Sequence, residues 1–210
     1  MNVINEIKEA GIIAVVRAED HNQAIALSKA MIAGGINIIE ITFTVPNAEV
    51  AISELAKMNN VIIGAGTILN QVDAEKAIKN GAQFIVGPNF NKEVLEECKK
   101  NNIPYIPGCM TVQEITNALD EGVEIIKLFP ASTFGPKYLK ALKGPLPDLE
   151  VIPTGGVDYN NIEDWLKAGA VAVGVGGELT SGKTKGMATL TELSKAYVKR
   201  IKTLKQYFLK

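Results

Sequence analysis

The sequence predicts an α/β fold, a closed (β/α)8 barrel in which parallel strands alternate with helices. Short apolar runs rich in β-branched residues recur along the chain of 210 residues, with segments of helical spacing between them. Such continuous apolar runs are typical of parallel strands that are buried on both faces. Charged residues or glycine and proline stand at almost every strand end, which favours the barrel. The alternative, an open doubly wound sheet, would carry a glycine fingerprint after its first strand, where this chain has VVRAEDH.

Eight apolar runs follow one another, and each is expected to form one barrel strand. In chain order they cover residues 12–17, 37–44, 61–67, 83–88, 104–109, 124–130, 150–156 and 170–177. The polar N-terminal segment is expected to form a helix, and residues 185–209 a long closing helix. Thr111 and Glu114 have the spacing of a capping box, which predicts a helix start. No linker or change of composition divides the chain, so we expect a single domain over residues 1–210.

The composition limits the classes of function. The formal net charge of −1 argues against a nucleic-acid binder that works through a basic surface. No apolar run approaches the roughly 20 residues of a membrane span, and the N-terminus lacks the apolar core of a signal peptide, so we expect a cytoplasmic protein. Cys98 and Cys109 have no metal-binding or disulfide spacing. His21 is the only histidine and is expected at a helix start, so we expect no histidine metal site and no cofactor.

A lysine stands in the middle of the sixth run, EIIKLFP. Lys127 shares one strand face with Ile125 and Phe129, and Ile126 and Leu128 share the other. Burial disfavours the charged form of an amine, so a purely structural strand would avoid this residue. One interpretation is an ammonium that pairs with a carboxylate or reaches water. The other is a nucleophilic amine that forms a Schiff base with a ketone.

The first two runs add an arginine and a carboxylate. Glu40 alternates with Ile38 and Thr42 and is expected to point into the same interior as Lys127. A lone buried Glu is rare, so this pair is either a structural ion pair or a nucleophile beside a general acid/base. Arg17 ends the first run. It is either an ordinary surface residue or a planar grip for a carboxylate.

Small residues end four further runs. The third run ends in GAGT at Thr67, and the fourth ends in Gly-Pro at Pro88. The seventh and eighth runs end in the glycine pairs Gly155-Gly156 and Gly176-Gly177. Barrels often hold a phosphate on the backbone N–H groups of loops at those two strands. A nucleophilic lysine, a carboxylate, an arginine and a phosphate cradle together suit a Schiff-base aldolase acting on a phosphorylated 2-oxo acid.

Several motifs resemble the 2-dehydro-3-deoxy-phosphogluconate aldolase family, whose members often also cleave 4-hydroxy-2-oxoglutarate. The motifs, which span nearly the whole chain, are AGGINIIEITFTVPNA, IIGAGTILN, GAQFIVGPNF, IPYIPGCMT, IIKLFPAS and VIPTGGV. The resemblance implies a class I aldolase that forms a homotrimer, with Lys127 as the Schiff-base lysine and Glu40 as the acid/base. It also implies that Thr67, Pro88 and Phe129 line the pyruvate pocket and that the two glycine pairs bind phosphate.

Two positions depart from the pattern of that family. No arginine follows Glu40 on its strand, which leaves Arg17 to grip the substrate carboxylate. Glu178 stands where many members have serine, and its carboxylate would repel a phosphate unless it points away. Three alternatives therefore stay open: the epimeric 2-dehydro-3-deoxy-6-phosphogalactonate, an unphosphorylated substrate such as 4-hydroxy-2-oxoglutarate, and a catalytically silent barrel used for binding.

Overall fold

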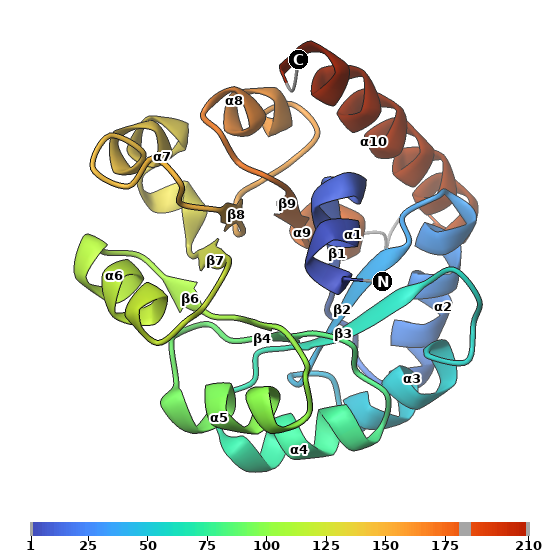
Figure 1. Cartoon of the computed structure of the whole chain (residues 1–210). Coiled ribbons are helices and arrows are strands. Elements are labelled where there is room, and N and C mark those ends of the chain that lie inside the picture. Colours follow the sequence, from blue (N-terminus) through green and yellow to red (C-terminus); the bar gives the residue numbers. More distant parts are fainter. Residues whose placement is uncertain (1, 181–185, 209–210) are drawn as a thin grey trace.

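The strands form the centre of the molecule and the helices form a ring around them (Figure 1). A computed structural model of the chain describes residues 2–180 and 186–208. The strands are β1 (Ile12–Val16), β2 (Ile38–Thr42), β3 (Ile62–Gly66), β4 (Ile85–Val86), β5 (Tyr105–Ile106), β6 (Gly108–Cys109), β7 (Ile126–Leu128), β8 (Val151–Pro153) and β9 (Val173–Val175). The helices are α1 (Val3–Ala10), α2 (His21–Ala33), α3 (Ala48–Leu55), α4 (Gln71–Lys79), α5 (Lys92–Lys100), α6 (Val112–Asp120), the 3-10 turn η1 (Ala131–Thr133), α7 (Pro136–Leu142), α8 (Ile162–Lys167), α9 (Gly177–Thr180) and α10 (Gly186–Phe208).

The strands close into a barrel. Their pairing is parallel throughout, in the orders β5-β4-β3-β2-β1-β9 and β6-β7-β8. A parallel bridge between Thr154 and Gly174 joins β8 to β9. At the other seam, Pro107 splits the fifth predicted run into β5 and β6. Proline has no N–H to donate, but the carbonyl of Pro107 accepts from the N–H of Lys127 at 2.9 Å. The barrel prediction is confirmed, and the open-sheet alternative is wrong.

Alternation along each strand divides the buried side chains into two cores. One core fills the barrel and is closed from below by Ile4 and Ile7 of α1. It includes the strand residues Ile13, Ile38, Ile62 and Ile152, together with Phe84 and Ile125, which directly precede β4 and β7. The larger core lies between the strands and the surrounding helices. Because α1 covers the amino ends of the strands, it crosses the front of the barrel in Figure 1, and the carboxyl ends open on the opposite face.

The helix predictions are confirmed within the described residues. The N-terminal helix is α1, and the closing helix is α10 (Gly186–Phe208); residues 185 and 209 of the predicted range lie outside the described part of the chain. Thr111 and Glu114 form the predicted capping box at the start of α6. His21 is the first residue of α2. Across residues 2–180 and 186–208, no helix is both long and apolar enough to cross a membrane.

Candidate active site

Lys127 and Glu40 face each other inside the barrel. Each occupies the central position of its strand, β7 and β2, and points inward as the strand alternation predicts. The Nζ atom of Lys127 lies 3.6 Å from Oε1 of Glu40, and the two side chains are only 5% and 3% exposed. Two strands that are far apart in the sequence therefore bring an amine and a carboxylate together out of contact with bulk water.

The carboxylate of Glu40 has an unusual environment. Its Oε1 atom is buried without a hydrogen-bond partner among the described residues. A buried polar atom of this kind calls for an explanation, such as a ligand or a catalytic role. Gly66 of β3 provides the space, because a Cβ atom at residue 66 would lie 1.9 Å from that oxygen. On the other side of the pair, the ammonium of Lys127 lies 5.2 Å from the centroid of the Phe129 ring, within cation–π range.

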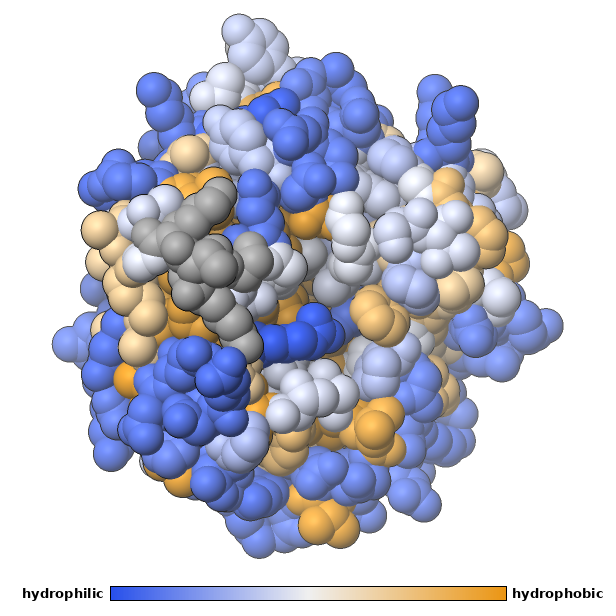
Figure 2. Space-filling model, turned by 180° about the vertical axis from the view of Figure 1, so that it is seen from behind, coloured by the Kyte–Doolittle hydropathy of each residue, from blue (hydrophilic) through white to orange (hydrophobic). Residues whose placement is uncertain are grey.

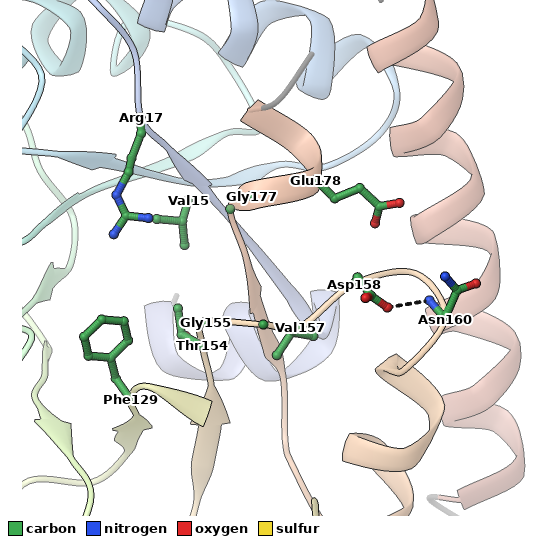
Figure 3. A pocket seen from close by; sticks show the side chains of 12 residues that line it. Val15, Arg17, Phe129, Thr154, Gly155, Val157, Asp158, Asn160, Gly177 and Glu178 are labelled. Atoms are coloured by element: carbon green, nitrogen blue, oxygen red, sulfur yellow. Dashed lines mark hydrogen bonds between the residues drawn. The ribbon is translucent and has the colours of Figure 1, made fainter. Parts of the chain in front are cut away.

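A cavity of about 350 Å³ opens beside Phe129 at the carboxyl ends of the strands (Figure 3). Its lining includes the four glycines predicted to bind phosphate, Gly155, Gly156, Gly176 and Gly177. Gly155 and Gly156 have φ angles of 89° and 80°, which favour glycine over residues that carry a Cβ atom. Figure 2 shows this face of the molecule, which is hollowed near its centre. The structure thus brings the two predicted glycine loops into one cavity.

Arg17 belongs to the same cavity. Its side chain extends from the end of β1 toward Phe129 (Figure 3), and a Cβ atom at Gly176 would lie 3.7 Å from its Nη1 atom. The structure thus places Arg17 beside the second glycine pair, in the same cavity as the four glycines.

Glu178 also lines the cavity, but its carboxylate is directed away from Arg17 and toward α10 (Figure 3). Its Oε2 atom accepts the N–H of Tyr159 at 3.0 Å and the phenol of Tyr197. Burial and the neighbouring Glu178 carboxylate raise the pKa of the Tyr197 phenol, so this phenol stays protonated as the donor. The carboxylate of Glu178 thus points away from the space that Arg17 borders, which is the condition for its compatibility with a bound phosphate.

Asp158 is the second carboxylate in the lining of this cavity. It accepts the backbone N–H groups of Asn160 and Asn161 at 2.9 and 3.0 Å. Both acids of the cavity are therefore engaged by donors of the protein.

Thr67 and Pro88 have no described contact with Lys127, but each lies next to a residue that contacts the central pair or lines a cavity with one. Thr67 directly follows Gly66 and has a left-handed φ of 60°. Pro88 lines a second cavity, of about 580 Å³, together with Phe129. The Phe129 ring is thus shared by the two cavities.

Three residues outside the predicted set shape the part of the cavity around the glycine loops, namely Thr154, Tyr159 and Tyr197. Thr154 is buried and packs against Gly174. A Cβ atom at residue 174 would lie only 2.2 Å from Oγ1 of Thr154, so glycine is needed there. Tyr159 and Tyr197 hold Glu178. Only Tyr197 left a signal, because it lies on the buried stripe of α10 formed by Leu190, Ser194, Tyr197, Ile201 and Leu204. A tyrosine on a core-facing stripe needs a partner for its hydroxyl.

Comparison with known proteins decides the family. Residues 3–195 match the family model described as "KDPG and KHG aldolase". The chain is a member of this aldolase family. It is 36% identical over 171 residues to the 2-dehydro-3-deoxy-6-phosphogalactonate aldolase of Escherichia coli, covering 80% of this chain and 83% of the relative. It is 37% identical over 161 residues to the 2-dehydro-3-deoxy-phosphogluconate aldolase of Pseudomonas aeruginosa, covering 76% and 73%.

A solved structure of another aldolase carries the same fold. The KDPG aldolase of Legionella pneumophila, with pyruvate captured as a covalent carbinolamine, superposes with a TM-score of 0.82 at 31% identity, covering 90% of this aldolase and 95% of that chain. In the described part of this aldolase, no group of three or more His, Cys, Asp or Glu side chains could hold a metal ion.

Proposed function

We propose that this aldolase cleaves 2-dehydro-3-deoxy-6-phosphogluconate reversibly to pyruvate and glyceraldehyde 3-phosphate through a Schiff base on Lys127. The observation that carries the proposal is the buried pair of Lys127 and Glu40, 3.6 Å apart, in the interior of an aldolase barrel. A catalytically silent barrel would gain little from two ionisable groups in its core, because each costs several kcal/mol to remove from water.

Formation of the imine needs a neutral amine. Transfer of a proton from Lys127 to Glu40 converts two buried charges into two neutral groups, and the free amine then attacks the C2 ketone of the substrate. The resulting carbinolamine loses its hydroxyl as water when Glu40 returns the proton. The product is a protonated imine, whose positive charge at C2 makes it an electron sink.

Carbon–carbon cleavage follows from that charge. A base, Glu40 acting through a water molecule, removes the proton of the C4 hydroxyl. The C4 oxygen forms a carbonyl, the C3–C4 bond breaks, and its electron pair moves through C3 into the imine to give an enamine. Glyceraldehyde 3-phosphate leaves, Glu40 protonates C3, and water hydrolyses the imine to release pyruvate.

The phosphate end of the substrate is assigned to the cavity of the glycine loops. Arg17 supplies a guanidinium there, and the four glycines leave the backbone N–H groups accessible to an anion. Phe129 borders both Lys127 and this cavity, so one extended substrate reaches from the amine to the phosphate site. Thr67 and Pro88 are proposed to border the pyruvate end.

A second substrate has support from the comparisons. The relative from E. coli is named for 2-dehydro-3-deoxy-6-phosphogalactonate, which differs only in the configuration of one hydroxyl. The family description also includes KHG, 4-hydroxy-2-oxoglutarate, which has no phosphate. Measuring kcat/KM for all three substrates ranks them. If the value for 2-dehydro-3-deoxy-6-phosphogalactonate is higher than that for 2-dehydro-3-deoxy-6-phosphogluconate, the phosphogalactonate becomes the main substrate.

Borohydride reduction in the presence of pyruvate tests the proposed chemistry. The expected result is a mass adduct on Lys127. Lys127→Met, which keeps most of the side-chain volume but has no amine, is expected to give no adduct. Glu40→Gln is expected to form the adduct about 100-fold to 10,000-fold more slowly, the usual contribution of a positioned acid or base. An adduct on a different lysine in the parent protein would refute the assignment.

We further propose that the aldolase works as a homotrimer in the cytoplasm. Large apolar side chains are exposed near the carboxyl ends of the strands, where a subunit contact would cover them. They are Leu69, Val72, Val112 and Phe134. Both cysteines are free thiols, in keeping with a reducing compartment. Light scattering after size-exclusion chromatography measures the subunit number directly.

A further inference from the structure

The two glycine loops of the phosphate cavity are tied together by a carboxylate. Strands β8 and β9 meet for the last time at the bridge between Thr154 and Gly174. Beyond it, in the described residues, the N–H of Tyr159 in the segment after β8 donates to Oε2 of Glu178 in α9, at 3.0 Å. Glu178 therefore links the two segments that carry the glycine pairs.

The carboxylate is also fixed from the side of α10. The phenol of Tyr197, a fully buried residue of α10, donates to the same Oε2 atom. The Tyr197 ring packs edge-on against the Tyr159 ring, with 5.4 Å between centroids. The guanidinium of Arg200 covers Tyr159 at 4.7 Å from the ring centroid. We call Glu178, Tyr159 and Tyr197 the Glu178 latch; it joins both loops to the long closing helix.

The latch also fixes the direction of the negatively charged Glu178 carboxylate. Glu178 and Arg17 line the same cavity, so the direction of the Glu178 carboxylate decides how close its negative charge lies to the space that Arg17 borders. Both donors of the latch hold the carboxylate on the side that faces α10, away from Arg17 (Figure 3). Like charges repel at short range, so a latched carboxylate leaves room for a phosphate and a free one opposes it.

We propose that Glu178 is a positioning residue that sets the preference of this aldolase for substrates with a terminal phosphate. It acts by holding the two glycine loops at their spacing and by keeping its own charge outside the anion position. The proposal rests on the proposed phosphate cavity. It assigns Glu178 no contact with the substrate.

The test compares kcat and KM for 2-dehydro-3-deoxy-6-phosphogluconate and for unphosphorylated 4-hydroxy-2-oxoglutarate. Tyr197→Phe is expected to raise KM for the phosphorylated substrate about tenfold, the effect of losing one hydrogen bond to a charged group. Glu178→Ala loses both hydrogen bonds of the latch and is expected to raise this KM at least as much. Their KM for the unphosphorylated substrate is expected to change less than about twofold. Glu178→Gln keeps an oxygen acceptor without the charge and is expected to retain most of the affinity for the phosphorylated substrate.

Matched controls exist on the same helix. Tyr207 is 75% exposed, so Tyr207→Phe removes a hydroxyl of α10 outside the latch. Glu192, whose side chain is 70% exposed, provides the control Glu192→Ala. Neither control is expected to change KM for either substrate. Competitive inhibition by inorganic phosphate gives a second readout, and its inhibition constant is expected to rise in Tyr197→Phe and in Glu178→Ala.

An equal rise of KM for both substrates, or no rise for either, would overturn the proposal. If the buried Tyr197→Phe change prevents folding, the half-exposed Glu178 variants decide the question alone. Borohydride trapping of pyruvate on Lys127 separates this failure from a failure of the proposed function. Trapping depends on the lysine and not on the phosphate cavity, so it is expected to succeed in every latch variant.

Discussion

Replacing Gly66 with alanine tests whether the Glu40 carboxylate must stay at its position in the barrel. A Cβ atom at residue 66 would lie 1.9 Å from Oε1 and 2.5 Å from Cδ of Glu40. Ordinary contact between heavy atoms begins near 3.4 Å, so the carboxylate has to move by about 1.5 Å. That movement disturbs its approach to Nζ of Lys127, which is 3.6 Å in the parent.

The expected loss of activity follows from the size of this movement. Misplacement of a reacting group by about 1 Å costs on the order of 100-fold in rate. We therefore expect kcat/KM of Gly66→Ala to fall about 100-fold, which corresponds to about 2.7 kcal/mol of transition-state stabilisation. Release of pyruvate, coupled to its reduction by NADH and lactate dehydrogenase, measures this value. The rate of borohydride trapping is expected to fall in parallel.

Gly64→Ala is the matched control on the same strand. A Cβ atom at residue 64 would lie 2.4 Å from the Phe84 ring, so this change also overpacks the barrel interior but acts on an apolar side chain. Both variants are expected to lose about 1–3 kcal/mol of stability. Only Gly66→Ala is expected to lose the chemistry. Equal kcat/KM values for the two folded variants would refute the reasoning that the position of Glu40 carries catalysis.

Three further predictions concern other parts of the chain. Arg17→Ala is expected to raise KM for the phosphorylated substrate more than about tenfold, the loss of a charged contact of roughly 1.5–3 kcal/mol, with little change for 4-hydroxy-2-oxoglutarate; an equal loss for both would favour the carboxylate grip suggested by the sequence. Burial raises the pKa of Cys98 and of Cys109 to about 12, so neither thiol of the native protein is expected to react with a disulfide reagent at about pH 8, and both are expected to react in urea. The backbone N–H groups of Thr111 and Met110 lower the pKa of Glu114 below its ordinary value of 4.5; this adds stability that is present above about pH 4.5 and is lost as the pH falls through the lowered pKa, so Glu114→Gln is expected to flatten the acid side of a plot of unfolding free energy against pH.

Much of the fold was determined by local sequence patterns. Each of the eight apolar runs contains a barrel strand. The strands are shorter than the runs because pairing stops where the chain leaves the barrel. Pro107 breaks one run into β5 and β6, as expected for a residue without an N–H donor. The capping box of Thr111 and Glu114 was predicted from its spacing alone. Such features depend on residues that are close in sequence, so they can be identified without a tertiary structure.

The sequence by itself also determined which two ionisable side chains meet at the centre of the barrel. A lysine and a glutamate that are both buried inside a barrel are expected to pair, because a lone buried charge is rare. The alternation of side chains along a strand predicted that both point into the interior. The glycine pairs at the seventh and eighth strands pointed to one anion site for a similar reason, because parallel strands end at the same edge of a barrel.

Only the tertiary structure decided the orientation of the remaining charges. From the sequence, we expected Arg17 to bind a carboxylate and Glu178 to repel a phosphate unless it points away. The sequence specifies which residue follows a strand, but it does not specify the direction of a long side chain. In the structure, Arg17 borders the cavity that the glycine loops line, and Glu178 is held by Tyr159 and by Tyr197. Tyr197 lies on the closing helix, far along the chain from the glycine loop that Tyr159 belongs to, and no local pattern links them. The direction of a flexible charged side chain is set by hydrogen-bond partners that the fold brings in from distant segments.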